Sequence, residues 1–444
     1  MGIWDEIRFR LHGLIVRLGI RTYSLRYLEK WILLGSITGI IGGLSAIAFY
    51  YLLEFFTNIF EIIGEQLAHI SPFLAPLTVG LGGLIVGPII FFLAPEAAGH
   101  GTDAVIQAFH KRWGIMRTRV PVIKVLASSI TIGSGGSAGR EGPIAQISAG
   151  LASLIAKFLR LRVPDRKIIL VCGIASGIGS IFKSPLGAAL FSVEVLYKRD
   201  LEIHALIPAI VSSVVGYSVY ASHFGWEPVL FFPECYFVHL IDLPLFIILG
   251  IVCGLLALFY VKIFYGVTAL FMNKLNCPNF IKPGIGGLIT GIIAIFMPQV
   301  LGMGYEGIEQ CFSASLPIEA MLLLAFGKIL ATSFTIGSGG SGGVFAPSLF
   351  IGAMIGGSLG HFYSKSLSWA LTDIPIFSIT GMAAFFAGAA KVPLTSIVMT
   401  CEMTGNYSLL LPLMLAVSSS YIIAGEESIY ESQLRFSRER VLTR

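Results

Sequence analysis

Residues 139–143 read Gly-Arg-Glu-Gly-Pro and place a glutamate between two apolar segments. An ionisable side chain inside an apolar segment is costly to bury, so it is a functional-site hypothesis by default. Its chemistry would be the gain and loss of a proton, which removes and restores one negative charge. Glu141 is therefore the first candidate site residue. The alternative is a structural ion pair between Glu141 and the adjacent Arg140.

Two glycine-rich stretches offer a second chemistry, the binding of an anion by backbone N–H groups. They read GSGGSAG at residues 133–139 and GSGGSGG at residues 337–343, and Pro143 and Pro347 follow them. This pattern is typical of a helix start, and an interrupted helix leaves free N–H groups and the positive end of its dipole at the break. A bound anion satisfies both. Tight packing of small residues explains one such stretch better, but two corresponding copies favour an anion site.

An internal repeat relates the two glycine-rich stretches. Residues 124–137 (KVLASSITIGSGGS) correspond to residues 328–341 (KILATSFTIGSGGS), and eleven of the fourteen positions are identical. A second pair, 173–194 with 381–402, follows in the same order, and a weaker pair, 99–109 with 302–312, precedes both. Membrane repeats of this kind commonly pair with inverted topology and hold a substrate at the midplane, where broken helices meet. The repeat therefore predicts a site between two halves.

Residues that match across the repeat are expected to be scaffold, and residues that differ are expected to be functional. Glu194 and Glu402 match, which favours a shared structural role for both. The departures are Glu141, which faces Phe345, and His100, which faces Met303.

The elements that position these residues must be helices in a membrane. The chain has 444 residues, of which 55% are hydrophobic and 12% are charged, whereas a soluble globular chain carries about 25% charged residues. Apolar stretches long enough to cross a bilayer, roughly 20 residues each, recur along the chain from residues 31–53 onward. We expect an all-α integral membrane protein with two inverted-topology repeats of tilted and broken helices.

Charge and cysteine usage exclude other classes. The net charge of +5 is concentrated in the two ends and in short loops, which by the positive-inside rule predicts that both termini are cytoplasmic and gives no support to nucleic-acid binding. Such a protein would lie in the cell inner membrane if it comes from a prokaryote. The six cysteines are scattered singly, without a metal-ligand spacing, so we expect buried apolar cysteines, no metal and no cofactor.

Five segments follow from these patterns. They are a cytoplasmic amphipathic segment at 1–30, a first membrane repeat at 31–222, a connecting segment at 223–241, a second membrane repeat at 242–430, and a short cytoplasmic tail at 431–444. The first segment has no short apolar core and cleavage site, so it does not resemble a removable signal peptide.

The motifs GREGP (139–143) and GGVFAP (342–347) resemble those of the CLC family of chloride channels and proton/chloride exchangers. APEAAGHG, FKSPL, EMTGNY and SIY extend the similarity over residues 31–430. The resemblance implies that Glu141 is a gate whose carboxylate competes with the anion. The implied anion-binding positions are His100, Arg140, Gly142, Val344, Phe345 and Tyr430. It also implies chloride as the transported ion and a homodimer with one pathway per subunit.

Two departures from the family pattern bear on mechanism. His100 occupies the place of a serine whose hydroxyl binds the anion in many members, so an imidazole replaces a hydroxyl there. Val195 occupies the place of the inner glutamate that carries protons in exchangers, and valine holds no proton. We therefore expect channel-like or weakly proton-coupled transport. The alternatives are a proton/chloride exchanger with a non-standard inner proton route, and an exchanger selective for nitrate or fluoride.

A different class of function is an intramembrane serine protease. Residues 339–342 (GGSG) match the nucleophile pattern of such enzymes, and His361 is the nearest downstream histidine. The signal is weak because Ser137 repeats Ser341 in the other half, and a nucleophile needs a positioned base. We expect no enzymatic activity.

Overall fold

Helices form every regular element in the residues that the computed structural model describes, which are 27–71, 73–230, 240–313, 315–367 and 373–437. The longest described helix, α2 (Tyr27–Ile70), has 44 residues and a length of about 66 Å at 1.5 Å per residue. That exceeds a bilayer core of about 30 Å, so α2 is either strongly tilted or extends beyond the hydrocarbon. The predicted first span at 31–53 is thus too short, and most of the predicted segment 1–30 lies outside the described residues.

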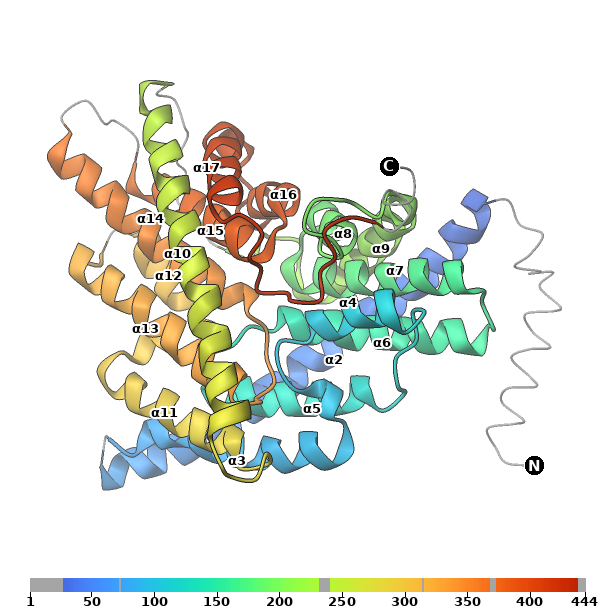
Figure 1. Ribbon diagram of the computed structural model, residues 1–444, viewed down its shortest axis with the longest axis horizontal. Coiled ribbons are helices and arrows are strands. Elements are labelled where there is room, and N and C mark those ends of the chain that lie inside the picture. The colour runs from blue at the N-terminus through green and yellow to red at the C-terminus, as the bar shows by residue number, and fades with distance from the viewer. Residues whose placement is uncertain (1–26, 72, 231–239, 314, 368–372, 438–444) are drawn as a thin grey trace.

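The repeat is visible in the order of the helices (Figure 1). The first half continues with α3 (Thr78–Pro88), α4 (Thr102–Lys111), α5 (Val120–Gly133), α6 (Glu141–Phe158), α7 (Val163–Phe182), α8 (Pro185–Glu194) and α9 (Leu206–Phe224). The second half runs through α10 (Leu243–Ala269), α11 (Lys282–Phe296), α12 (Tyr305–Phe312), α13 (Ile318–Gly337), α14 (Phe345–Ser366), α15 (Ile374–Ala390), α16 (Pro393–Thr404) and α17 (Leu410–Ile423). Each helix from α2 to α9 therefore has a counterpart eight helices later.

Six helical segments in the described part are long and apolar enough to cross a membrane. They are Glu29–Ile70, Ala75–Leu93, Ile203–Phe224, Leu240–Lys274, Ile318–Gly337 and Phe345–Ser366. Other apolar helices, among them α5, α11 and α15, are shorter. This mixture of full and short helices agrees with the expected all-α membrane architecture of tilted and broken helices.

Two buried lysines hold equivalent loops in the two halves. The Lys124 ammonium on α5 donates to the carbonyls of Ala97 and Gly99, at 3.0 and 2.8 Å. Lys328 on α13 donates to the equivalent two carbonyls of the second half, at 2.9 and 2.8 Å. Each pair of bonds fixes the loop that leads into the next short helix, α4 or α12. The matched lysines therefore belong to the scaffold.

Glu194 and Glu402 tie the two halves together by capping each other's helices. The Glu194 carboxylate accepts from the N–H groups of Leu394 and Thr395, at 3.0 and 2.8 Å, in the first turn of α16. Glu402 makes the same contacts with the first turn of α8, at 3.2 and 2.7 Å. A carboxylate at a helix N-terminus satisfies free N–H groups and opposes the positive end of the dipole. The predicted shared structural role is confirmed.

Cysteines mostly follow their prediction. Cys172, Cys253, Cys311 and Cys401 are buried, as expected for small apolar side chains. Cys277 differs because it is half-buried in the loop before α11. Cys235 lies outside the described residues.

Candidate anion pathway

The N-termini of α6 and α14 meet where the two glycine-rich stretches cross. Gly139 and Gly343 exchange two backbone hydrogen bonds, at 2.8 Å from the first N–H and 2.5 Å from the second. A Cβ atom on Gly343 would lie 2.9 Å from the carbonyl oxygen of Gly139, closer than real Cβ atoms come. Glycine is therefore required for the two chains to approach, and this approach brings two helix N-termini to one point in the interior.

A narrow cavity lies next to this crossing. It has a volume of about 10 Å³, close to the smallest space that holds one water-sized particle. Its walls combine polar groups with apolar side chains, contributed by Thr102, Glu141, Gly142, Ile178, Phe182, Phe191, Phe345, Met399 and Tyr430. Helix N-termini around a small buried cavity favour an anion.

Glu141 lies at the first residue of α6, and its side chain is 2% exposed. Its Oε1 accepts a hydrogen bond from the Tyr305 hydroxyl at 3.1 Å, while its buried Oε2 has no hydrogen-bond partner among the described residues. No ion pair within 4 Å joins Glu141 to Arg140 in the described part of the chain. The two side chains therefore do not form the close ion pair of the structural alternative, and the Glu141 carboxylate faces the backbone N–H of Ala346 at the start of α14.

Tyr305 was not identified from the sequence as a site residue. It is the first residue of α12, and its ring faces the Arg140 guanidinium at 5.8 Å. The repeat contained the signal, because the fourth position of the pair 99–109 and 302–312 carries a hydroxyl in both halves, in Thr102 and in Tyr305. Tyr305 binds the Glu141 carboxylate, and Thr102 lines the central cavity.

His100 lies beside the cavity but does not line it. Its ring centroid is 5.3 Å from that of Tyr430, which does line the cavity. His100 instead lines a separate cavity of about 260 Å³ together with Asp103 and Arg112. Its buried Nδ1 has no hydrogen-bond partner among the described residues. In this segment the cavity beside Glu141 is lined instead by Thr102, two residues after His100.

The other predicted positions divide between the cavity and its frame. Gly142, Phe345 and Tyr430 line the cavity. Arg140 and Val344 immediately precede α6 and α14 as their N-cap residues, so they belong to the helix starts rather than to the cavity wall.

Val195 is fully buried at the C-terminal end of α8 and lies outside the central cavity. Its carbonyl accepts a hydrogen bond from the Gln433 side chain at 3.0 Å. The position expected for an inner proton carrier is thus occupied by an apolar side chain in a packed environment.

Ser341, the nucleophile of the protease alternative, is engaged in scaffold contacts. Its hydroxyl donates to the Ala97 carbonyl at 2.9 Å and contacts the Ser128 hydroxyl at 2.9 Å. A serine nucleophile needs a base within hydrogen-bond reach. The hydrogen-bond partners of Ser341 in the described part of the chain include no histidine.

Comparison with known proteins agrees with this geometry. A family model described as voltage gated chloride channel matches residues 82–425. The chain belongs to this family. It is 32% identical to an uncharacterized protein of Methanocaldococcus jannaschii over 402 residues, covering 90% of this chain and 95% of the relative. It is 28% identical to an H⁺/Cl⁻ exchange transporter of Vibrio vulnificus, covering 90% and 88% of the two chains.

The fold agrees with that of a solved family structure. The crystal structure of a slow cyanobacterial Cl⁻/H⁺ antiporter superimposes with a TM-score of 0.83 at 23% identity and covers 95% of this chain and 99% of that one. This voltage-gated chloride channel family member is therefore a multi-pass integral membrane protein with the CLC fold, and CLC-type anion transport is its class of activity.

Proposed function

We propose that this chain moves chloride or a similar small anion along a pathway gated by Glu141. The observation that carries the proposal is the position of the carboxylate. It lines a cavity of about 10 Å³ beside two helix N-termini, with one oxygen bonded to Tyr305 and the carboxylate facing the backbone N–H of Ala346 at the start of α14. An ionised carboxylate there fills the space that an anion would take. It also interacts with the positive helix ends that would attract the anion. Protonation removes its charge and releases the position.

The experiment is chloride efflux from liposomes that contain the purified protein. Wild-type efflux should depend on pH, and Glu141→Gln should conduct without that dependence. Efflux equal to that of protein-free liposomes would contradict anion transport itself. Parallel measurements with nitrate and fluoride determine the preferred anion, because selectivity depends on the few groups that contact the ion. A preference for either over chloride would favour the selective-exchanger alternative.

Transport in this proposal is channel-like or weakly coupled to protons. Val195 holds no proton at the inner position, and its surroundings are fully packed. Neighbouring Glu194 does not replace it, because its carboxylate is bonded to the start of α16. Coupled exchange would therefore need another protonatable group on the inner side.

His100 is the specific observation that favours the alternative of an exchanger with a non-standard proton route. An imidazole can gain and lose a proton, and this one, whose pKa is lowered by burial to about 4, lies beside a cavity of about 260 Å³ and the ring of Tyr430. The Vibrio relative is named an H⁺/Cl⁻ exchange transporter. Uphill proton movement driven by a chloride gradient, lost in His100→Ser, would establish this alternative.

We further propose a homodimer with one pathway per subunit and both termini in the cytoplasm, in the inner membrane if the source is prokaryotic. The family resemblance supports the dimer, and the basic residues near both ends support the orientation. Mass determination in detergent tests the dimer. Labelling of single cysteines near each end in sealed vesicles tests the orientation.

A further inference from the structure

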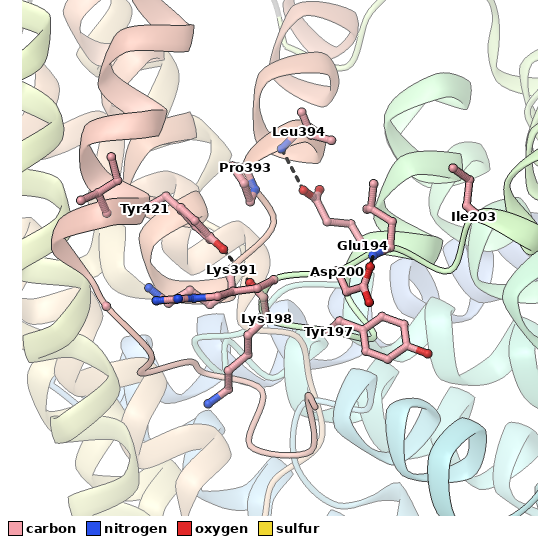
Figure 2. A pocket seen from close by; sticks show the side chains of 13 residues that line it. Glu194, Tyr197, Lys198, Asp200, Ile203, Lys391, Pro393, Leu394 and Tyr421 are labelled. Carbon is pink, nitrogen blue, oxygen red and sulfur yellow. Dashed lines mark hydrogen bonds between the residues drawn. The ribbon is translucent and has the colours of Figure 1, made fainter. Parts of the chain in front are cut away.

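A second cavity lies away from the anion pathway, beside the ends of α8, α15 and α17 (Figure 2). Its volume is about 590 Å³, and three basic residues, Lys198, Arg199 and Lys391, contribute to its wall. This is far more space than a single chloride ion needs. It is large enough for a polyatomic group with several hydrogen-bond acceptors.

Lys391 is the buried cation of this wall. Its side chain is 1% exposed, and its ammonium has no hydrogen-bond partner in the described part of the chain. The ring centroid of Tyr421 lies 5.5 Å from the nitrogen. Burying a charged group is costly unless the group is paired and hydrogen-bonded. The protein therefore carries a cation here for which it supplies no acceptor among these residues.

The equivalent lysine of the first half shows what is missing. Lys183 and Lys391 each follow a helix, α7 and α15, with left-handed backbone at φ values of 51° and 61°. The Lys183 ammonium donates to the carbonyls of Phe224 and Glu227, at 3.3 and 2.9 Å. These acceptors lie at the end of α9 and in the chain after it. In the second half, Lys391 lies at the cavity wall and has no such pair of carbonyl acceptors among the described residues.

The acidic residues around the cavity are already engaged. Glu194 caps α16, and Asp200 accepts from the N–H groups of Leu201 and Ser437, at 2.9 and 3.0 Å. Glu426 is paired with Arg199 at 2.6 Å. No carboxylate of the described residues forms an ion pair with Lys391 within 4 Å. Because Arg199 is paired with Glu426 and Lys198 donates to the Glu426 carbonyl at 2.7 Å, the Lys391 ammonium is the cation of this wall that remains for a ligand.

Exposed apolar side chains also contribute to the cavity wall. Ile203, Leu394 and Ile422 line the cavity and are 64%, 46% and 72% exposed. In a membrane protein, exposed isoleucine and leucine side chains of this kind suit contact with hydrocarbon. The wall thus combines a buried cation and two further basic residues with exposed apolar side chains.

We propose that this cavity binds the phosphate group of an anionic phospholipid. The phosphate oxygens would accept from the Lys391 ammonium, with Lys198 and Arg199 at the same wall, and the acyl chains would lie against Ile422 and its apolar neighbours. Anionic lipid headgroups bind basic pockets of membrane proteins on the cytoplasmic side. Inorganic phosphate shares the headgroup chemistry but has no acyl chain, so the two sources can be separated.

The test is native mass spectrometry of the full-length protein, released from detergent after titration with dioleoyl phosphatidylglycerol or dioleoyl phosphatidylcholine. Wild type should retain the anionic lipid in preference to the zwitterionic one. Lys391→Met should weaken that retention about tenfold or more, and Lys391→Arg should preserve it. Lys157→Met, which removes an exposed ammonium outside the cavity, serves as the matched control and should bind as wild type does.

Arg199→Met keeps the proposal testable if Lys391→Met does not fold, because it removes a half-exposed cation of the same wall and should also weaken retention. Equal retention of phosphatidylglycerol by wild type and by the folded cavity variants would overturn the proposal. Thermal stabilisation by inorganic phosphate that depends on Lys391, without lipid retention, would overturn the lipid assignment and identify a soluble phosphate as the occupant.

Discussion

The Tyr305 hydroxyl donates to the Glu141 carboxylate at 3.1 Å, and this hydrogen bond joins residues 164 positions apart in the two halves of the chain. Glu141 is the first residue of α6, and Tyr305 is the first residue of α12. A hydrogen bond to a charged group contributes about 1.5–3 kcal/mol. The bond therefore stabilises the ionised carboxylate in the position where, as we propose, it competes with the anion.

Replacement of Glu141 should separate gating from conduction. Glu141→Gln and Glu141→Ala should conduct chloride at all pH values with little pH dependence, because neither side chain changes charge. The measurement is chloride efflux from liposomes between about pH 4.5 and 8. Efflux through Glu141→Ala that stays as pH-sensitive as wild type would show that another group gates the pathway.

Removal of the Tyr305 hydroxyl should destabilise the closed state. Tyr305→Phe keeps the ring against Arg140 but loses the bond, and a loss of about 1.5–3 kcal/mol corresponds to roughly a 10- to 100-fold lower occupancy of the closed position relative to the open one. Efflux at high pH should therefore rise. Tyr363→Phe is the matched control, because the buried Tyr363 hydroxyl has no hydrogen-bond partner among the described residues. Equal efflux from Tyr305→Phe and wild type at high pH would refute the role of the hydroxyl.

The Thr102 hydroxyl should contribute to anion affinity. Thr102→Val preserves the shape of the side chain and removes one hydroxyl from the cavity wall. A hydrogen bond to a charged group contributes about 1.5–3 kcal/mol, so chloride affinity, measured by calorimetry, should fall roughly 10- to 100-fold. Thr380→Val is a suitable control because the Thr380 hydroxyl is buried without a partner in the described part. Unchanged affinity in Thr102→Val would exclude the hydroxyl as a ligand.

His100 should make chloride affinity depend on pH if its imidazole gains a proton beside the anion. Affinity should then rise as pH falls, and His100→Ser should remove this dependence. The alternative is a packed neutral histidine. Burial lowers the pKa of His100 to about 4, so the comparison is made at about pH 3.5 and about pH 7.5. Equal affinity at both, unchanged in His100→Ser, would establish that alternative.

Tight proton coupling is not expected. A chloride gradient across liposomes should drive little uphill proton movement, because Val195 carries no proton and Glu194 is committed to α16. Glu194→Gln should instead lower stability, by about 0.5–2 kcal/mol as for other helix caps, and Glu402→Gln should do so to a similar extent. Robust proton pumping with a fixed stoichiometry that persists in Glu194→Gln would contradict the uncoupled mechanism.

The sequence alone determined the features that depend on local pattern. Apolar length predicted membrane helices, and the repeat predicted two halves whose broken helices meet, because glycine-rich segments followed by proline end one helix and begin another wherever they occur. Glu141 was identified because an ionisable residue is unusual in such a segment. The matched pair Glu194 and Glu402 was correctly assigned to the scaffold, since both halves need the same cap.

Tertiary structure decided which groups meet. The bond between Tyr305 and Glu141, and the choice of Thr102 over His100 at the cavity wall, depend on how one half is placed against the other, which no local pattern specifies. Lys183 and Lys391 show this most directly. They share the same helix end and the same backbone conformation, yet only Lys183 finds carbonyl acceptors in the described chain. The difference arises because hydrogen bonds form over about 3 Å in space, and distant segments of the folded chain decide what lies within that distance.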